Sequence, residues 1–157
     1  MSLEAVKKYF SDYGIGHRII TLNTSTATVE EAAIAHGVDP DQIGKTLSFK
    51  IDEKPILIVV SGNAKIDNQK YKRHFTKKAK MLSLQEVIEH TGHAAGGVCP
   101  FGLKKEIDVY LDISLKQHTE IMPAAGNHKS AIRLTIAELE KYSNHVNWVD
   151  VCKKNNY

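Results

Sequence analysis

The sequence predicts a single α+β domain, residues 1–157, built around a curved and mostly antiparallel sheet. Helical and strand patterns are mixed along the chain without strict β-α-β alternation. Of the 157 residues, 42% are hydrophobic and 25% are charged, which is the balance of an ordinary globular protein. The chain also shows no internal repeat, low-complexity tract or linker that would divide it.

The first quarter of the chain contains two helical patterns around a short strand. An apolar stripe over residues 3–13 repeats at three- and four-residue steps and predicts a helix that Gly14 ends. Residues 17–22 are typical of an edge strand. Residues 28–37 open with the Thr and Glu of a capping box and end on Gly, which indicates an alanine-rich helix. Asp39-Pro40 then marks a second helical start.

Two paired strands are expected next. Residues 46–51 and 56–61 are rich in β-forming side chains, and residues 52–55 between them have the composition of a turn. Residues 56–60 are apolar throughout, so we expect a central strand that is covered on both faces.

Two short helices and a loop follow the paired strands. Asp67 can cap a helix in which Tyr71 and Phe75 lie four residues apart. A second helix is predicted over residues 84–90, before Gly92. Residues 96–102 contain too much Gly and Pro for the interior of a helix or strand, so we expect a shaped loop there.

The last third of the chain should complete the sheet. Strands are expected at residues 109–111, 119–123, 131–134 and 148–151. A capping box at the start of residues 135–142 predicts a final helix between the last two strands.

Positive charge is concentrated in one stretch. The chain has 21 Lys and Arg against 18 Asp and Glu, and this formal charge of +3 is too small by itself to indicate a nucleic-acid partner. Residues 65–80, however, contain many cations and one acid, Asp67. Such a stretch is either a solvated helix face or a surface that neutralises phosphates. Its cations are Lys65, Lys70, Lys72, Arg73, Lys77, Lys78 and Lys80.

The composition also argues against several classes of protein. No apolar run approaches the roughly 18 residues that span a bilayer, and the first residues lack a signal-peptide core, so we expect a cytoplasmic protein without a membrane partner. Cys99 and Cys152 have no metal-binding spacing and should be free thiols. His90 and His93 lack an acid or cysteine that would complete a ligand set, so no metal is expected.

Three features could carry chemistry. Lys45 precedes a strand, where its ammonium could bind a phosphate or polarise a carbonyl, or could simply extend into solvent. The loop over residues 96–102 is either a structural turn or a site where a ligand approaches backbone N–H groups, although it lacks the P-loop pattern. Cys99 could be a nucleophile with His93 or His128 as base, or a buried or pocket-lining thiol.

Several short motifs, taken in chain order, resemble the YbaK/prolyl-tRNA synthetase-associated editing domains, which deacylate mischarged tRNA. The resemblance covers roughly residues 6–151. The motifs are Gln42-Ile43-Gly44-Lys45-Thr46-Leu47, Val59-Val60-Ser61-Gly62, Thr91-Gly92-His93 with the loop over residues 96–102, Leu111-Asp112, and Ala124-Ala125-Gly126-Asn127-His128.

The resemblance implies a curved mixed sheet or partly open barrel flanked by helices, and a hydrolase that cuts the ester between an amino acid and the tRNA 3′ adenosine. Such a reaction requires an oriented water and a stabilised oxyanion, but neither a metal nor a covalent nucleophile. Lys45 would engage the ester or the terminal nucleotide. Gly96 and Gly97 would offer backbone N–H groups to the ester carbonyl, while His128 would lie on the opposite rim.

The same resemblance assigns the remaining site residues. The amino-acid pocket would be formed by Thr46, Val98, Cys99, Pro100, Phe101, Gly102, Asp112, Gly126 and Asn127. The acceptor end of the tRNA would be bound by Lys70, Lys72, Arg73, Lys77 and Lys78.

The implied substrate is a small amino acid such as Ala, Ser, Thr or Cys on tRNA(Pro) or a related tRNA. The sequence contains no synthetase catalytic core, so the domain is expected to act in trans, with a synthetase as a further candidate partner. The rim that begins at Gly126 is closer to the alanine-editing branches than to the Cys-tRNA(Pro) deacylases. Two alternatives are a tRNA- or synthetase-binding module without turnover, and a small-molecule esterase or thioesterase that uses Cys99.

Overall fold

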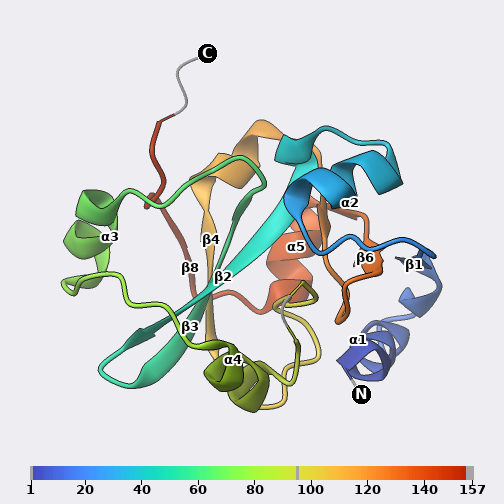
Figure 1. Cartoon of the computed structure of the whole chain (residues 1–157), viewed down its shortest axis with the longest axis horizontal. Coiled ribbons are helices and arrows are strands. Elements are labelled where there is room, and N and C mark those ends of the chain that lie inside the picture. Colours follow the sequence, from blue (N-terminus) through green and yellow to red (C-terminus); the bar gives the residue numbers. More distant parts are fainter. Residues whose placement is uncertain (1, 95, 155–157) are drawn as a thin grey trace.

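The protein is described here by a computed structural model that covers residues 2–94 and 96–154, and these form one α+β domain around a curled mixed sheet (Figure 1). The strands are β1 (Ile19–Thr21), β2 (Ile43–Ile51), β3 (Lys54–Ser61), β4 (Asp108–Asp112), β5 (Glu120–Pro123), β6 (Ser130–Ile132), β7 (Leu134–Thr135) and β8 (Asn147–Val149). Six of them form the main sheet in the order β7-β5-β2-β3-β4-β8, and β1 pairs with β6 in a separate ribbon.

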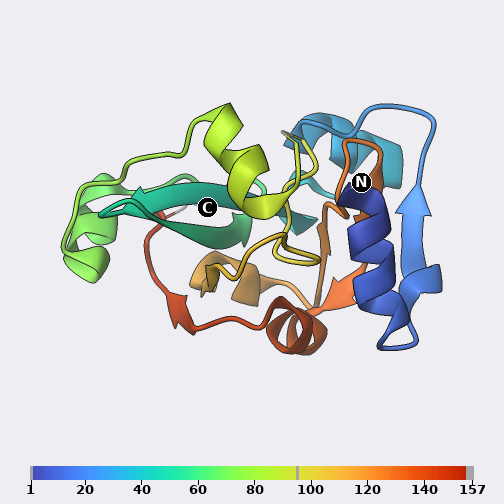
Figure 2. The ribbon, with the colours of Figure 1, turned by 90° about the horizontal axis from the view of Figure 1, so that it is seen from below.

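Helices surround the sheet. They are α1 (Ser2–Ser11), α2 (Val29–His36), α3 (Asn68–Phe75), α4 (Leu84–Thr91) and α5 (Ile136–Ser143), with 3-10 turns at Gly16–Arg18, Pro40–Gln42 and Ile113–Gln117. Figure 2 shows α4 and α5 on opposite sides of the molecule and α3 and α1 at its two ends.

The predicted helix boundaries are confirmed at several ends. Thr28 and Thr135 each accept a hydrogen bond from the backbone N–H three residues later, in complete capping boxes. The Asp67 side chain accepts from two backbone N–H groups at the start of α3. Gly37 and Gly92 end α2 and α4 in the left-handed conformation, which glycine adopts without steric cost.

The predicted central strand is also confirmed. β3 lies between β2 and β4, and its side chains alternate between two cores. Leu57 and Val59 pack with α1 and α5 in one core, whereas Ile58 and Val60 pack with Tyr71 of α3 in the other. Since residues 57–60 are fully buried, the apolar run reflects burial on both faces.

The sheet contains more parallel pairing than expected. The longest ladder, between β2 and β3, is antiparallel, but β2 with β5, β3 with β4, and β4 with β8 are parallel. Between β3 and β4 the chain passes through α3 and α4 and so returns to the same end of the sheet, which makes those strands parallel.

Some predicted strands differ in extent. Residues 16–18 form a 3-10 turn, so only Ile19–Thr21 of the expected edge strand is extended. Residues 131–134 do not form one strand, because the chain passes from β6 in the ribbon to β7 in the main sheet. At this transition the carbonyl of Arg133 accepts a hydrogen bond from Arg18, at 2.7 Å.

The same Arg18 side chain generates a pH prediction. It donates two hydrogen bonds to the carboxylate of Glu138, at 2.6 and 3.0 Å, and together with the α5 cap it lowers the pKa of Glu138 to about 2. We expect Glu138→Gln to lower the free energy of unfolding at pH 7 by about 1–2 kcal/mol. Because the folded-state pKa is depressed, this difference should be present above the ordinary value of 4.5 and be lost as the pH falls toward 2.

Urea unfolding of both proteins at pH 7, 5 and 3 checks this expectation. Glu4→Gln, at an exposed site in α1, is the matched control and should change the unfolding free energy by about 0.5 kcal/mol or less. A gap between Glu138→Gln and the wild type that stayed constant down to pH 3 would contradict the assigned pKa shift.

Candidate functional site

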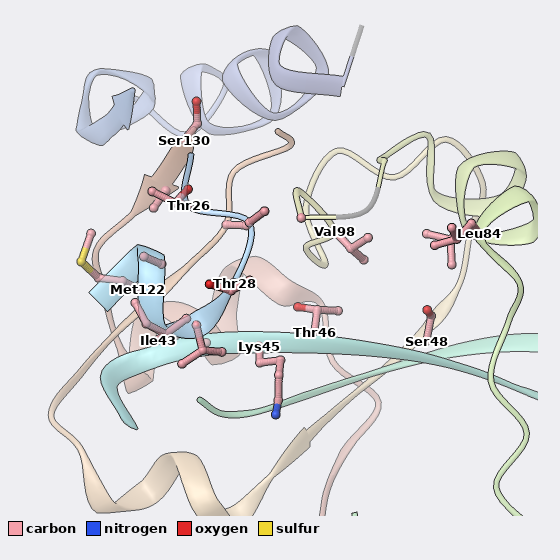
Figure 3. A pocket seen from close by; sticks show the side chains of 18 of the residues that line it. Thr26, Thr28, Ile43, Lys45, Thr46, Ser48, Leu84, Val98, Met122 and Ser130 are labelled. Atoms are coloured by element: carbon pink, nitrogen blue, oxygen red, sulfur yellow. The ribbon is translucent and has the colours of Figure 1, made fainter. Parts of the chain in front are cut away.

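A cavity of about 260 Å³ lies between α2, α4 and the first half of β2 (Figure 3). Its walls combine apolar and hydroxyl side chains. The apolar set includes Val29, Ala32, Ile43, Leu84, Val87, Val98 and Met122, and the hydroxyl set is Thr26, Thr28, Thr46, Ser48 and Ser130. A small concave site with a few polar groups is typical of ligand binding.

Three of these five hydroxyls already form hydrogen bonds within the protein. Thr26 donates to the carbonyl of His128 at 2.9 Å, Thr28 caps α2, and Ser130 shares a 2.8 Å hydrogen bond with Thr21. The Thr46 hydroxyl differs, because it is buried and has no hydrogen-bond partner among residues 2–94 and 96–154. Five other side-chain atoms of the described residues are buried without a partner, but among the residues that line the cavity only Thr46 has such an atom. A ligand would reach this hydroxyl after a small shift of the side chains around it.

Lys45 borders the cavity, but its amine does not point into it. Adjacent residues of a strand point to opposite faces, and Figure 3 shows the Lys45 side chain directed to the other side of β2 from Thr46 and Ser48. There Nζ donates to the carbonyl of Ala64 at 2.9 Å. Burial lowers the pKa of this amine, and the neighbouring Lys65 lowers it further.

The glycine-rich loop contacts the segment that begins at Gly126. Gly96 and Val98 line the cavity, and the N–H of Gly126 donates to the carbonyl of Gly97 at 3.2 Å. A Cβ atom at Gly97 would lie 2.5 Å from Cα of Asn127, so only glycine permits this approach. Gly97, Gly126 and Asn127 therefore form a wall behind the residues that line the cavity.

His128 belongs to the same rim. Its side chain is exposed, and a Cβ atom at Gly96 would lie 3.2 Å from the His128 Cβ. Its carbonyl accepts from both the N–H and the hydroxyl of Thr26, which ties the rim to the segment before α2. The structure thus brings residues 96–98 and 126–128 together. Gly96 and Val98 line the cavity with Thr46, whereas residues 126–128 lie outside its lining.

The second half of the loop leads away from the cavity. Cys99 and Phe101 are fully buried in the main core, Pro100 is buried beside them, and Gly102 packs against α1. The thiol of Cys99 lies 3.6 Å from Nε2 of His93, which in turn lies 2.8 Å from the carbonyl of Phe101. Burial raises the pKa of Cys99 to about 12, so the thiol is protonated at neutral pH.

Asp112 is also outside the cavity lining. It is fully buried at the end of β4, and its carboxylate accepts from the N–H of Ser114 and of Val151, each at 2.9 Å. These bonds hold the turn after β4 and the C-terminal segment, so Asp112 has a structural task in this fold.

The basic stretch divides into paired and unpaired cations. Lys70 donates to Asp150 at 3.0 Å and to the carbonyl of Cys152, and Lys77 lies 3.4 Å from Asp52. The side chains of Lys72, Arg73 and Lys78 are exposed and form no ion pair within the described part of the chain. They lie on or just after α3, at the end of the molecule opposite α1 (Figure 2).

Sequence reasoning missed several cavity residues, including Thr26, Thr28, Ser48 and Ser130. A signal existed for Ser48, because Thr46 and Ser48 lie two residues apart on one face of a predicted strand. Two further findings concern only residues 2–94 and 96–154. No group of three or more His, Cys, Asp or Glu side chains there is placed to hold a metal ion, and no helix is long and apolar enough to cross a membrane.

These features define the class of protein. It is an α+β domain with a small cavity, and a glycine-rich loop forms one wall of that cavity. The family model "Aminoacyl-tRNA editing domain" matches residues 23–142, and the chain belongs to this family, which confirms the resemblance drawn from its motifs.

Individual relatives agree with this family. "Uncharacterized protein YwhH" of Bacillus subtilis is 48% identical over 98% of both chains. "Putative Cys-tRNA(Pro)/Cys-tRNA(Cys) deacylase EbsC" of Enterococcus faecalis is 33% identical over 68% of this chain and 66% of its own length. A solved structure described as "Crystal structure of a putative trans-editing enzyme for prolyl tRNA synthetase" superimposes with a TM-score of 0.88, at 32% identity over 98% of both chains.

The burial of both cysteines generates a labelling prediction. Cys99 and Cys152 are buried, and burial raises the pKa of both thiols. We expect a disulfide reagent such as DTNB to label neither thiol of the folded protein at pH 8 within minutes, and both after denaturation. Rapid labelling of the folded wild type that disappeared in Cys99→Ala would show a reactive Cys99 and would revive the thioesterase alternative.

Proposed function

We propose that this chain is a free-standing hydrolase that removes a small amino acid, such as Ala, Ser, Thr or Cys, from mischarged tRNA(Pro) or a related tRNA. Membership of the editing-domain family and the names of its relatives support the reaction class. The observation that carries the proposal is the small cavity beside the glycine loop, in whose wall the Thr46 hydroxyl has no hydrogen-bond partner among the described residues.

The cavity suits ester hydrolysis in three ways. Attack of water on the ester carbonyl places negative charge on its oxygen, and donors aimed at that oxygen lower the barrier. The N–H of Gly97 already donates to the carbonyl of Ala94, whereas the N–H of Val98 donates to no other described residue, and we propose the latter as such a donor. Thr46 would bind the ester or the amino group from the floor, and the exposed His128 would hold the attacking water at the rim.

The cavity of about 260 Å³ has room for the aminoacyl end of the ester, and the preference for a small amino acid rests on the family and its relatives. Ala32, Ile43 and Met122 belong to one apolar cluster and form part of the cavity wall. An apolar pocket separates side chains that differ by one methylene only about 10- to 200-fold, so we propose activity on a group of small amino acids.

We propose Lys45 as a positioning residue in this reaction. Its amine holds the carbonyl of Ala64 on the far side of β2, and this bond fixes the strand at the residue next to Thr46. Removing the amine would leave a largely buried carbonyl without its donor, which costs about 1–3 kcal/mol.

A second candidate function is a tRNA- or synthetase-binding module without turnover. The orientation of the Lys45 amine away from the cavity favours it, because none of the described Lys and Arg side chains in the cavity lining then faces the ester. The thioesterase alternative has less support, since Cys99 is fully buried with a raised pKa.

The test of the proposed function is deacylation of Ala-, Ser-, Thr- and Cys-tRNA(Pro), with Ala-tRNA(Ala) and Pro-tRNA(Pro) as controls. We expect the wild type to hydrolyse one or two of the mischarged species. Thr46→Val keeps the side-chain shape but removes the hydroxyl, and should lower kcat/KM by about 10- to 100-fold. Thr46→Ser restores the hydroxyl and should retain most of the activity.

Lys45→Ala completes this experiment. We expect it to lose turnover and also to unfold at a lower Tm, because the amine stabilises the fold through Ala64. Loss of turnover at an unchanged Tm would instead place Lys45 in contact with the substrate. Binding of tRNA by the wild type without hydrolysis of any species would support the binding-module alternative.

The unpaired cations of α3 give a separate prediction. If Lys72 and Arg73 contact tRNA phosphates, the double variant Lys72→Gln/Arg73→Gln should bind tRNA more weakly, and the slope of log K against log salt should fall by about 1 to 2. Lys7→Gln/Lys104→Gln removes the same charge from other exposed positions and serves as the control. Equal effects of the two double variants would contradict a specific tRNA surface on α3.

A further inference from the structure

An apolar surface adjoins the cavity on the α4 side. Met81, Leu84 and Ile88 are 61%, 71% and 51% exposed, and we call these three side chains the α4 lip. Leu84 and Ile88 are four residues apart and so lie on one face of the helix. Met81 and Leu84 also line the cavity, so the lip continues the cavity wall outward.

Its continuity with the cavity separates the α4 lip from an ordinary exposed apolar residue. Single apolar side chains are common on protein surfaces and need no explanation. Ile34 of α2 is such a case, because it is 83% exposed but does not line the cavity. The α4 lip instead provides a further apolar contact for the part of a ligand that extends out of the cavity.

The size of the cavity indicates which part of a ligand would emerge. Sites that enclose whole small molecules measure roughly 300–1,000 Å³, and this cavity measures about 260 Å³. If the aminoacyl ester lies beside Thr46 and Val98, the attached ribose approaches the mouth and the base lies outside. A purine has two flat apolar faces, and the flexible thioether of methionine adapts well to an aromatic face.

The charges near the α4 lip fit a nucleic-acid strand. Lys78 and Lys80 immediately precede the lip, are exposed, and form no ion pair with any residue the structure describes. The carboxylate of Glu86, on α4 itself, is neutralised by Lys50 at 2.8 Å. A phosphate beside Met81 would therefore meet Lys78 and Lys80. On α4 itself, Glu89 keeps an exposed carboxylate 4.0 Å from Lys105, on the side of the lip away from these two lysines in sequence.

We propose that the α4 lip binds the unpaired 3′ end of the substrate tRNA, with the terminal adenine against Met81 and Leu84 and the preceding base near Ile88. This inference rests on the proposed function and adds a base-binding subsite to it. Adenine would then contribute to affinity through stacking on apolar side chains, and Lys78 and Lys80 would contact the adjoining phosphate.

Two stable probes test this subsite. One is 3′-alanylamino-3′-deoxyadenosine, in which an amide replaces the ester. The other, the methyl riboside, is the same compound with a 1-O-methyl group in place of adenine. We expect the wild type to bind the adenine probe more tightly than the methyl riboside. Because Met81 and Leu84 also line the cavity, Met81→Ser/Leu84→Ser should weaken binding of both probes, and binding of the adenine probe about tenfold more than binding of the methyl riboside.

Ile34→Ser is the control, because it removes an apolar side chain that is even more exposed than Met81 and Leu84 and does not line the cavity. The inference is overturned if the double variant weakens both probes equally, if it weakens neither, or if Ile34→Ser has the same effect. Deacylation by the wild type distinguishes failure of the subsite from failure of the proposed function. If the wild type hydrolyses the substrate but the double variant binds both probes like the wild type, only the subsite is refuted. If the wild type neither hydrolyses the substrate nor binds either probe, both proposals are refuted.

Discussion

The alternation of side chains along β2 is the constraint on which the site depends. The ladder between β2 and β3 pairs residues 44–51 with residues 54–61, so β2 cannot slip by one residue without exposing its apolar side chains. In this register Thr46 and Ser48 face the cavity, while Lys45 faces the opposite side. The position of the Thr46 side chain in the cavity wall is therefore a consequence of packing along the whole of β2.

Close approach of two backbones provides the other wall. The loop at Gly97 and the rim at Gly126 touch through their main chains, which no side chain larger than hydrogen would allow at Gly97. Because the contact is between backbones, the wall has a definite shape without a catalytic side chain. A site of this kind suits an activated ester, whose hydrolysis requires orientation and a stabilised oxyanion more than a strong nucleophile.

Cys99 and Asp112 illustrate how motif residues can stabilise the fold. Cys99 lies in the core beside His93, and Cys152 belongs to the second core. Asp112 holds the C-terminal segment through the N–H of Val151. These residues maintain the positions of the loop and the sheet, and their effect on a reaction in the cavity would be indirect.

The sequence by itself determined the local structure and the family. Capping boxes, helix-ending glycines and the apolar run of β3 act over a few residues, so their patterns are visible in the chain. The ordered motifs around Lys45, Gly96 and Gly126 likewise identified the editing-domain family. Only the tertiary structure decided which face of β2 borders the cavity, that Cys99 and Asp112 are buried away from it, and that the α4 lip adjoins its mouth. Those outcomes depend on contacts between residues far apart in the chain, which no local pattern encodes.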